Sequence, residues 1–277
     1  MLSFQLICYR ELMMDLKIKG KTALVTGGVQ GIGESITRNL LAEGVRVIAT
    51  SRSQSAIDGF VSGDFLGKSN LSTYRTELTG EADVGNLIEQ LRSDGHVIDI
   101  LVNNAGHTLN VTNPHCPIED WRRVFALNFE LPVRLINALS PSMKERQWGR
   151  IVNITSCAGL ENSGPVTFSA TKAALTAYTR SMGRVFAIES PKIVMTAVFP
   201  GVVVTKGGHW EHVLKTNPEH AEKYLQERCP LGRFGEVDEI GPIVAFYCSE
   251  LASFCHGAIV PADAGQSKHF MSFNYMD

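Results

Sequence analysis

The sequence predicts an α/β fold in which a doubly wound parallel sheet of about seven strands carries helices on both faces. Short apolar runs typical of buried strands alternate with amphipathic runs of helical period along the chain. A glycine-rich turn joins the first of these strands to the first helix. A length of 277 residues, of which 44% are hydrophobic and 19% charged, suits one globular domain with a sizeable core.

Charge, cysteine and histidine usage exclude several classes of protein. The formal net charge is −2 and no basic run occurs, so neither nucleic acid nor an anionic membrane surface is indicated as a partner. No apolar stretch reaches the roughly 18 residues of a membrane span. The six cysteines lack C-x-x-C spacing, which is typical of reduced thiols in a cytoplasmic protein. No metal site is indicated, because H-E-x-x-H is absent and His209 and His212 share a helix face at best.

The chain is expected to begin with an N-terminal extension over residues 1–13. Arg10 and Glu11 interrupt its apolar part and no small-residue cleavage site follows, so it is not a signal peptide. Met14 is an alternative start. Residues 14–277 are then predicted to form a single dinucleotide-binding domain.

The glycine-rich turn T-G-G-V-Q-G-I-G occupies residues 26–33, after an apolar strand and before an amphipathic helix. Gly27 can adopt φ > 0 in the tight turn, Gly31 lets the backbone approach a pyrophosphate, and Gly33 lets helix and strand pack closely. Free N–H groups at the helix start would bind the phosphates. The spacing differs from G-x-G-x-x-G, so an ordinary glycine turn is the alternative and the rest of the chain must decide.

The second strand, residues 45–50, ends in Ser51 and Arg52. An acidic residue at this place would accept both ribose hydroxyls of NAD, but Ser51 occupies it. A guanidinium suits a 2′-phosphate, since it can form charge-assisted and bidentate hydrogen bonds. The sequence therefore favours NADP(H) over NAD(H), the alternative for Arg52 being a solvated side chain.

The remaining elements continue the alternation of strands and helices. A short helix and loop are expected over residues 53–70. Further strands are predicted at residues 71–76, 97–102, 151–155, 193–199 and 258–261, and helices at 81–92, 121–143, 166–188 and 237–249. The fourth strand ends in N-N-A-G at residues 103–106, small and amide residues that keep the carboxyl edge of the sheet open for a ligand.

Several further motifs occur in order: a helical Asn128, Ser156 after the fifth strand, Lys172, P-G-x-x-x-T at residues 200–205, P-L-G-R-F-G at 230–235 and D-A-G at 263–265. With the glycine turn and N-N-A-G, they resemble the short-chain dehydrogenase/reductase family from about Met14 onward. Ala264 departs from the usual glycine. The resemblance implies a Rossmann-type fold and hydride transfer between a nicotinamide and a carbonyl or alcohol. The cofactor-binding residues that it implies are Gly27, Val29, Gln30, Gly31, Ile32, Gly33, Ser51, Arg52, Glu77, Leu78, Asn104, Ala105, Gly106, Lys172, Pro200, Gly201, Val203 and Thr205.

The resemblance also assigns catalytic roles. Ser156 would polarise the substrate oxygen, Asn128 would maintain a water for proton relay, and Lys172 would hold the ribose and lower the pKa of a phenol. The family's tyrosine stands four residues before the lysine, on the same helix face. Here that position is Phe168, which has the shape of tyrosine but neither donor nor acceptor.

Two interpretations of Phe168 stand. It is either a natural aromatic in a chain that lost activity or a deliberate replacement of tyrosine that removes one oxygen. Intact Asn128, Ser156 and Lys172 favour the replacement. Two functions follow: an NADP(H)-dependent oxidoreductase impaired at its acid/base, and a catalytically silent cofactor-binding scaffold or regulatory subunit.

The substrate is expected to be a small carbonyl or alcohol compound beneath a lid at about residues 206–230. His107, Cys157, His209 and Trp210 are candidate substrate residues, and His212 and Lys215 could also line a pocket. The equal alternative is a polar lid whose Trp210 simply packs down. The resemblance further implies a homodimer or homotetramer that pairs the helices at residues 121–143 and 166–188.

Overall fold

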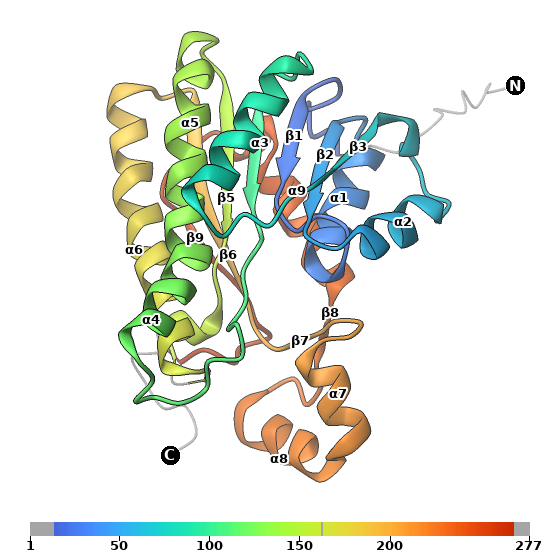
Figure 1. Cartoon of the computed structure of the whole chain (residues 1–277), viewed down its shortest axis with the longest axis vertical. Helices are drawn as coiled ribbons and strands as arrows, with labels where there is room; N and C mark the ends of the chain where they lie inside the picture. The colour runs from blue at the N-terminus through green and yellow to red at the C-terminus, as the bar shows by residue number, and fades with distance from the viewer. Residues whose placement is uncertain (1–13, 162, 269–277) are drawn as a thin grey trace, which may run out of the picture.

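The structure is a computed structural model that describes residues 14–161 and 163–268. The predicted N-terminal extension, residues 1–13, lies outside the described residues. The described chain forms a helix-flanked sheet, and a smaller helical segment projects from one end of it (Figure 1).

The sheet confirms the predicted doubly wound parallel architecture. Within the described residues it has seven strands in the order β3-β2-β1-β4-β5-β6-β9, all paired in parallel. The strand order runs outward in both directions from β1 and β4, which makes their boundary the switch point of the fold. The strands are β1 Thr22–Val25, β2 Arg46–Ser51, β3 Leu71–Arg75, β4 Ile100–Asn103, β5 Gly149–Ile154, β6 Ile193–Pro200 and β9 Ile259–Ala262.

Helices cover both faces of the sheet (Figure 1). The side chains of successive residues in a strand point to opposite faces, so Val25 enters one core and Leu24 the other. The first core packs under α1 and α9, and the second under α3 and α5. The helices that flank the sheet are α1 Gly31–Ala42, α2 Gln54–Ser62, α3 Glu81–Ser93, α4 Ile118–Phe125, α5 Leu131–Glu145, α6 Val166–Glu189 and α9 Gly241–Tyr247. None of the helices in the described ranges is both long and apolar enough to span a bilayer.

Two predicted helices are interrupted. The helix expected over residues 121–143 is α4 and α5 joined by a π-helical turn, Ala126–Glu130, that contains Asn128. The one expected over 237–249 is a short 3₁₀ turn, Val237–Glu239, followed by α9. The predicted strand at 97–102 was placed too early, since pairing begins at Ile100.

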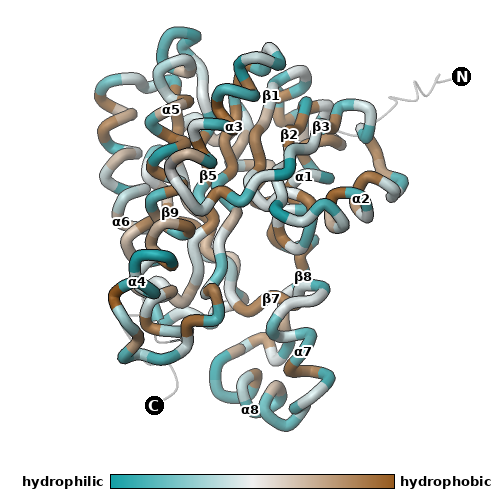
Figure 2. Tube along the Cα trace, viewed as in Figure 1, coloured by the Kyte–Doolittle hydropathy of each residue, from teal (hydrophilic) through white to brown (hydrophobic). Residues whose placement is uncertain are grey.

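The segment over residues 206–230 folds into two helices, α7 His209–Thr216 and α8 Pro218–Arg228. A two-stranded parallel sheet that the sequence did not predict, β7 Val203–Val204 with β8 Gly235–Glu236, connects this pair to the body. Figure 2 shows hydrophobic residues concentrated along the central strands, whereas α8 is largely hydrophilic. We call α7 and α8 the lid helices.

A buried arginine ties the amino-terminal end of the sheet together. The Arg150 side chain is 2% exposed and donates hydrogen bonds to the carbonyl oxygens of Ser249 at 2.7 Å and Lys192 at 3.1 Å. Its guanidinium lies 4.7 Å from the Trp148 ring centroid and 3.3 Å from the Glu250 carboxylate. Burial lowers the pKa of Arg150, but these partners compensate the desolvated charge.

We predict that Arg150→Met lowers the free energy of unfolding by about 2–4 kcal/mol, because buried carbonyl groups lose their donors. Urea denaturation measures the change. The control variant Glu34→Gln removes one charge of the partly exposed Glu34–Arg38 pair, so it should cost less than about 1 kcal/mol. Equal losses in the two variants would contradict this account.

Candidate active site

A cavity of about 580 Å³ opens at the carboxyl ends of the strands, across the β1–β4 switch point. Open α/β sheets bind ligands at this place. The structure brings most of the sequence-predicted site residues into this one cavity. The predicted residues that line it are Gly27, Gln30, Gly31, Ile32, Gly33, Ser51, Arg52, Glu77, Leu78, Asn104, Ala105, Gly106, His107, Ser156, Phe168, Lys172, Pro200, Gly201, Val203, Thr205 and Trp210.

The first turn of α1 forms one wall of the cavity. Gly27 has φ of 64° and Gly31 has φ of 55°, in the left-handed region that favours glycine. A Cβ at Gly33 would lie 2.1 Å from the carbonyl oxygen of Gly27, so only glycine allows the helix this close to the strand. The side chain of Gln30 does not cap the helix, which leaves the first N–H groups available to an anion.

Asn104 and Thr26 join the turns that follow β4 and β1. The Asn104 Nδ2 donates to the carbonyl oxygens of Thr26 at 2.9 Å and Gly27 at 3.2 Å. The Thr26 hydroxyl oxygen accepts from the backbone N–H groups of Asn104 and Ala105, both at 3.0 Å. These bonds hold the glycine turn against the neighbouring strand end.

The far end of the cavity carries Ser51 and Arg52 from β2 and Glu77 and Leu78 after β3. Arg75 was missed by the sequence reasoning. It ends β3 opposite Ser51, and its Nε donates to the carbonyl oxygen of Arg52 at 3.4 Å. The exposed guanidinium groups of Arg52 and Arg75 therefore lie at the ends of neighbouring strands. The sequence would have indicated Arg75 if β2 and β3 had been predicted to pair.

The opposite end carries Ser156, Phe168 and Lys172. Ser156 follows β5, and its hydroxyl oxygen accepts from the Ala158 N–H at 3.2 Å. On α6, the Lys172 Nζ lies 5.5 Å from the Phe168 ring centroid and donates to the Ile154 carbonyl oxygen at 2.8 Å. Lys172 makes no ion pair with any described residue, and burial lowers its pKa to about 8.

Asn128 is fully buried and does not line the cavity. Its Nδ2 donates to the carbonyl oxygens of Val124 at 2.8 Å and His107 at 2.9 Å, and its Oδ1 accepts from the His107 N–H at 3.1 Å. A Cβ at Gly106 would lie 2.8 Å from that Oδ1 and 2.9 Å from the Lys172 Nζ. Asn128 thus holds the His107 backbone beside the lysine, and the π-helical turn is the local distortion that places it there.

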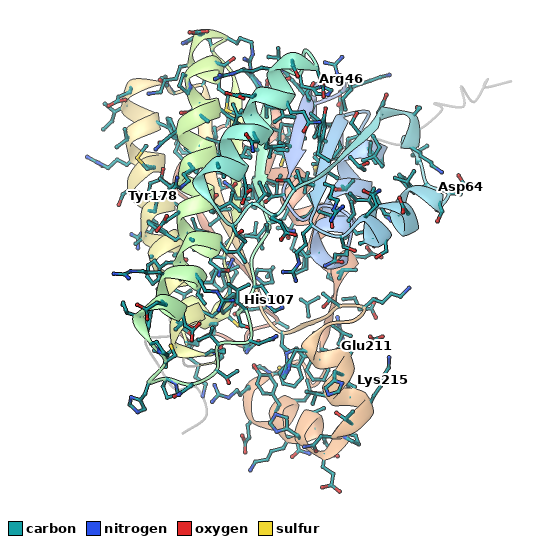
Figure 3. The ribbon with its side chains drawn as sticks, viewed as in Figure 1. Arg46, Asp64, His107, Tyr178, Glu211 and Lys215 are labelled. Carbon is teal, nitrogen blue, oxygen red and sulfur yellow. The ribbon has the colours of Figure 1, made fainter. Side chains whose placement is uncertain are left out.

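His107 lies between the sheet and the lid helices (Figure 3). Its Nδ1 accepts from the Leu109 N–H at 2.8 Å, so the neutral ring carries its proton on Nε2. Leu109 has φ of 51°, an uncommon conformation for leucine. Burial, and secondarily the charge of Arg52, lower the pKa of His107. The ring is therefore a neutral donor on the cavity wall at neutral pH.

Besides Asn128, three predicted site residues do not line this cavity. Val29 is 3% exposed and packs with Ile57 and Phe60 in a small core cluster. Cys157 is buried with its Sγ 3.7 Å from the Ser163 Oγ, and burial raises the pKa of its thiol. His209 lies in a neighbouring cavity beside Trp210. No cluster of at least three His, Cys, Asp or Glu side chains that could hold a metal ion occurs among residues 14–161 and 163–268.

Other lining residues were not predicted, although most follow strand ends. Their positions at the carboxyl edge were the signal that could have found them, because parallel strands end at one edge of the sheet. They include Thr50, Thr76, Thr79, Leu127, Ile154, Thr155, Val202, Lys206, Gly207 and Gly208.

Known proteins are similar to this chain in sequence over most of its length. A 3-oxoacyl-[acyl-carrier-protein] reductase FabG of Aquifex aeolicus is 34% identical over 256 residues, covering 91% of this chain and 99% of that protein. The corresponding reductase of Pseudomonas aeruginosa is 31% identical over 251 residues, covering 90% and 98%.

Solved structures agree with these similarities. L-sorbose reductase of Gluconobacter frateurii, complexed with NADPH and L-sorbose, superposes with a TM-score of 0.82 at 27% identity, covering 91% of this chain and 98% of that chain. A 3-oxoacyl (acyl-carrier-protein) reductase of Agrobacterium tumefaciens with NADP bound gives 0.81 at 26% identity, covering 94% and 100%. The family profile described as short chain dehydrogenase matches residues 21–211. This chain belongs to the short-chain dehydrogenase family.

Proposed function

We propose that the chain is an NADP(H)-dependent oxidoreductase that interconverts a carbonyl and an alcohol, with its proton transfer impaired by Phe168. One observation carries the proposal: Ser156 and Lys172 line the same cavity as the α1 amino terminus and Arg52. A dinucleotide needs hydrogen-bond donors that face its phosphates in one part of such a cavity, and groups that assist hydride transfer in another. The NADPH and NADP bound in the two similar structures support this cofactor.

The residues would hold the cofactor along the cavity. The first-turn N–H groups of α1 would bind the pyrophosphate, and Arg52 with Arg75 would face the 2′-phosphate. The Lys172 ammonium, which now donates to the Ile154 carbonyl, has further hydrogens for the ribose hydroxyls. When bound, the nicotinamide would supply the hydride for the substrate carbon.

At the reacting end, the Ser156 hydroxyl would donate a hydrogen bond to the substrate oxygen and so polarise the carbonyl. In this family a tyrosine then donates the proton, and we place Phe168 at that position, since it stands four residues before Lys172 on α6. A phenyl ring has no proton to give. The negative charge that develops on the substrate oxygen would therefore lack its usual donor.

A catalytically silent scaffold is the second candidate function, and Phe168 is the observation that favours it. Such a chain would still bind NADP(H), because the glycine turn and Asn104 do not depend on the phenol. The two functions predict different results for Phe168→Tyr. An impaired oxidoreductase should gain activity from the added hydroxyl, whereas a scaffold should not.

We also propose that the chain forms a homodimer or homotetramer through α6 and its neighbour α5. Ala173, Ala174 and Ala177 leave part of the α6 surface exposed and free of bulky side chains, which allows another helix to approach closely. Light scattering at micromolar concentration should give at least twice the monomer mass of 30.3 kDa. A monomer would contradict the proposal.

We predict that Arg52→Ala weakens NADPH binding by roughly 5- to 150-fold, because a charged partner of the 2′-phosphate costs about 1–3 kcal/mol when removed. NADH binding should be unchanged, since NADH lacks that phosphate. Calorimetric titration of both cofactors measures the two affinities. NADH that binds the parent chain as tightly as NADPH would contradict the cofactor assignment.

We predict that Phe168→Tyr raises carbonyl reduction by roughly 100- to 10,000-fold, the usual range for one positioned general acid. NADPH affinity and thermal stability should hardly change, because an aromatic ring of the same shape fills the site. Initial rates over a panel of carbonyl compounds provide the measurement.

The control is Phe168→Tyr combined with Lys172→Ala, which should lose most of the gain. The cause is electrostatic: the Lys172 ammonium should hold the pKa of the restored phenol below its free value of about 10. If Phe168→Tyr binds NADPH but remains inert over the whole panel, the scaffold is the correct function.

A further inference from the structure

A second cavity of about 540 Å³ lies beneath the lid helices, next to the candidate active site. Ser163 and Gly164, from the loop before α6, form one wall, and His220 and Tyr224 of α8 form another. Trp210 lines both this cavity and the candidate active site. A Cβ at Gly164 would lie 3.7 Å from the Phe168 ring, which places this wall of the cavity against that ring. We call this space the lid cavity.

Aromatic rings cluster around Trp210 in the lid cavity. The ring centroids of Trp210 and Tyr224 are 4.3 Å apart, and the Trp210 and His220 rings are nearly parallel, at 9° and 6.2 Å. Charges of both signs border the rings, with the Lys223 ammonium 3.7 Å from the Glu227 carboxylate. This lining suits a neutral ligand with both carbon–hydrogen surface and hydroxyl groups better than a long acyl chain.

The hydroxyl group of Tyr224 is held in place by a hydrogen bond that it accepts, and its own hydrogen stays available to a ligand. Its phenol oxygen accepts a hydrogen bond from the Gln266 Nε2 at 2.8 Å, and the Gln266 Oε1 accepts from the Val202 N–H at 3.0 Å. Both amide atoms of Gln266, which is 7% exposed, are therefore engaged. Nothing among the described residues accepts the phenol's own hydrogen. Burial raises the pKa of Tyr224, so the phenol keeps that hydrogen at neutral pH.

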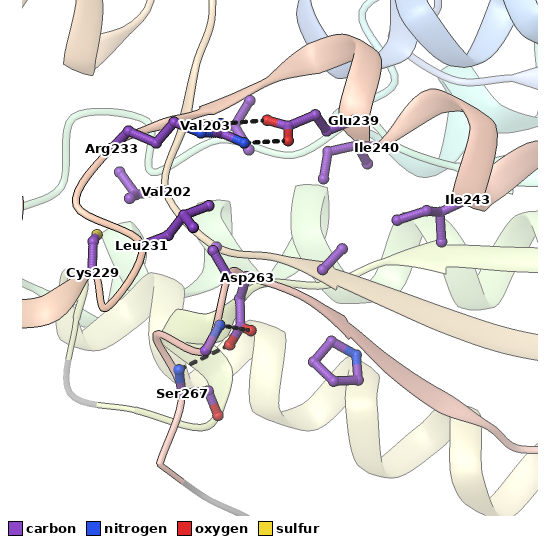
Figure 4. Close-up of a pocket in the computed structure, with 16 residues that line it drawn as sticks. Val202, Val203, Cys229, Leu231, Arg233, Glu239, Ile240, Ile243, Asp263 and Ser267 are labelled. Carbon is purple, nitrogen blue, oxygen red and sulfur yellow. Dashed lines mark hydrogen bonds and ion pairs between the residues drawn. The ribbon is translucent and has the colours of Figure 1, made fainter.

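The turn after β9 places Gln266 within hydrogen-bond distance of Tyr224 on α8. The Asp263 carboxylate accepts from the N–H groups of Gly265 at 3.1 Å and Ser267 at 2.9 Å (Figure 4). Ala264 adopts φ of 53° inside this turn, a left-handed conformation that is costly for alanine. The Tyr224 oxygen is thus positioned by a braced turn from the far end of the chain.

We propose that the lid cavity binds the hydroxyl-bearing part of a polyhydroxy carbonyl substrate, with Tyr224 donating its hydrogen bond to a substrate hydroxyl. The proposal rests on the oxidoreductase function above and names its substrate class. The reacting carbonyl lies at Ser156, and the remaining hydroxylated carbons extend past Trp210 toward Tyr224. Tyr224 is accordingly a specificity-determining residue rather than a proton donor to the reacting oxygen.

The test compares two ketones of equal carbon number on the NADPH-saturated chain. L-sorbose carries hydroxyl groups along its carbon chain and hexan-2-one carries none. Calorimetric titration should show that L-sorbose binds and that Tyr224→Phe weakens this binding by roughly 5- to 30-fold, as expected for one lost hydrogen bond. Hexan-2-one affinity should stay within about 2-fold. Gln266→Leu should weaken L-sorbose in the same direction, because it frees the phenol oxygen. Tyr178→Phe, which deletes the same oxygen on the far part of α6, is the matched control and should change neither ketone.

Two results would overturn the inference: unchanged L-sorbose binding in Tyr224→Phe, or tighter binding of hexan-2-one than of L-sorbose to the parent chain. NADPH titration of the same samples separates this failure from that of the proposed function. A parent chain that does not bind NADPH contradicts both. A chain that binds NADPH and yet shows no dependence on Tyr224 contradicts the polyhydroxy substrate alone.

Discussion

The hydrogen bonds between the turns after β1 and β4 are the constraint on which the rest of the structure depends. At this boundary the strand order reverses, so the helices that follow β1 and β4 lie over opposite cores and leave a crevice between the two strand ends. Asn104 holds the two turns together by donating to the carbonyl oxygens of Thr26 and Gly27. The same contacts leave no room for a side chain at Gly33, which places the start of α1 at the crevice. The wall of free N–H groups at the start of α1 is therefore a direct result of how two strands are joined.

At the end of the crevice that carries Lys172, the cost of burying a charge is balanced against the few contacts that stabilise it. The Lys172 ammonium is desolvated without a carboxylate partner in the described chain, and its stabilisation comes from one carbonyl oxygen and the face of the Phe168 ring. A buried cation of this kind destabilises the free chain and becomes favourable when a ligand supplies oxygen atoms. The arrangement makes sense as half of a site that a bound ribose completes. The Phe168 side chain has no proton to donate, and its ring leaves this half of the site in place.

Local sequence patterns were sufficient for the architecture of the main sheet, because strand and helix periods and the glycine turn are short-range signals, but they placed the start of β4 too early and missed the β7–β8 pair. They did not predict the π-helical turn at Asn128, which follows from hydrogen bonds to His107, 21 residues away. They also missed the start of α8, although Asn217 and Pro218 form a usual helix beginning. The pairing of Gln266 with Tyr224 spans 42 residues and has no local signature. That Phe168 replaces a tyrosine deliberately, and that residues 14–277 form one domain, stay predictions.

The position of Trp210 gives the chain an internal optical reporter. Of the three tryptophans, Trp210 lines the candidate active site, whereas Trp121 lies on α4 and Trp148 packs against Lys21 and Arg150 at the other end of the sheet. Reduced nicotinamide absorbs light in the range where indole emits, so excitation of Trp210 can pass to a neighbouring dihydronicotinamide by resonance energy transfer. Because Trp210 belongs to α7, the efficiency of that transfer would depend on the distance between α7 and the bound cofactor. Tryptophan fluorescence would therefore report, in the unlabelled protein, how close α7 lies to the cofactor.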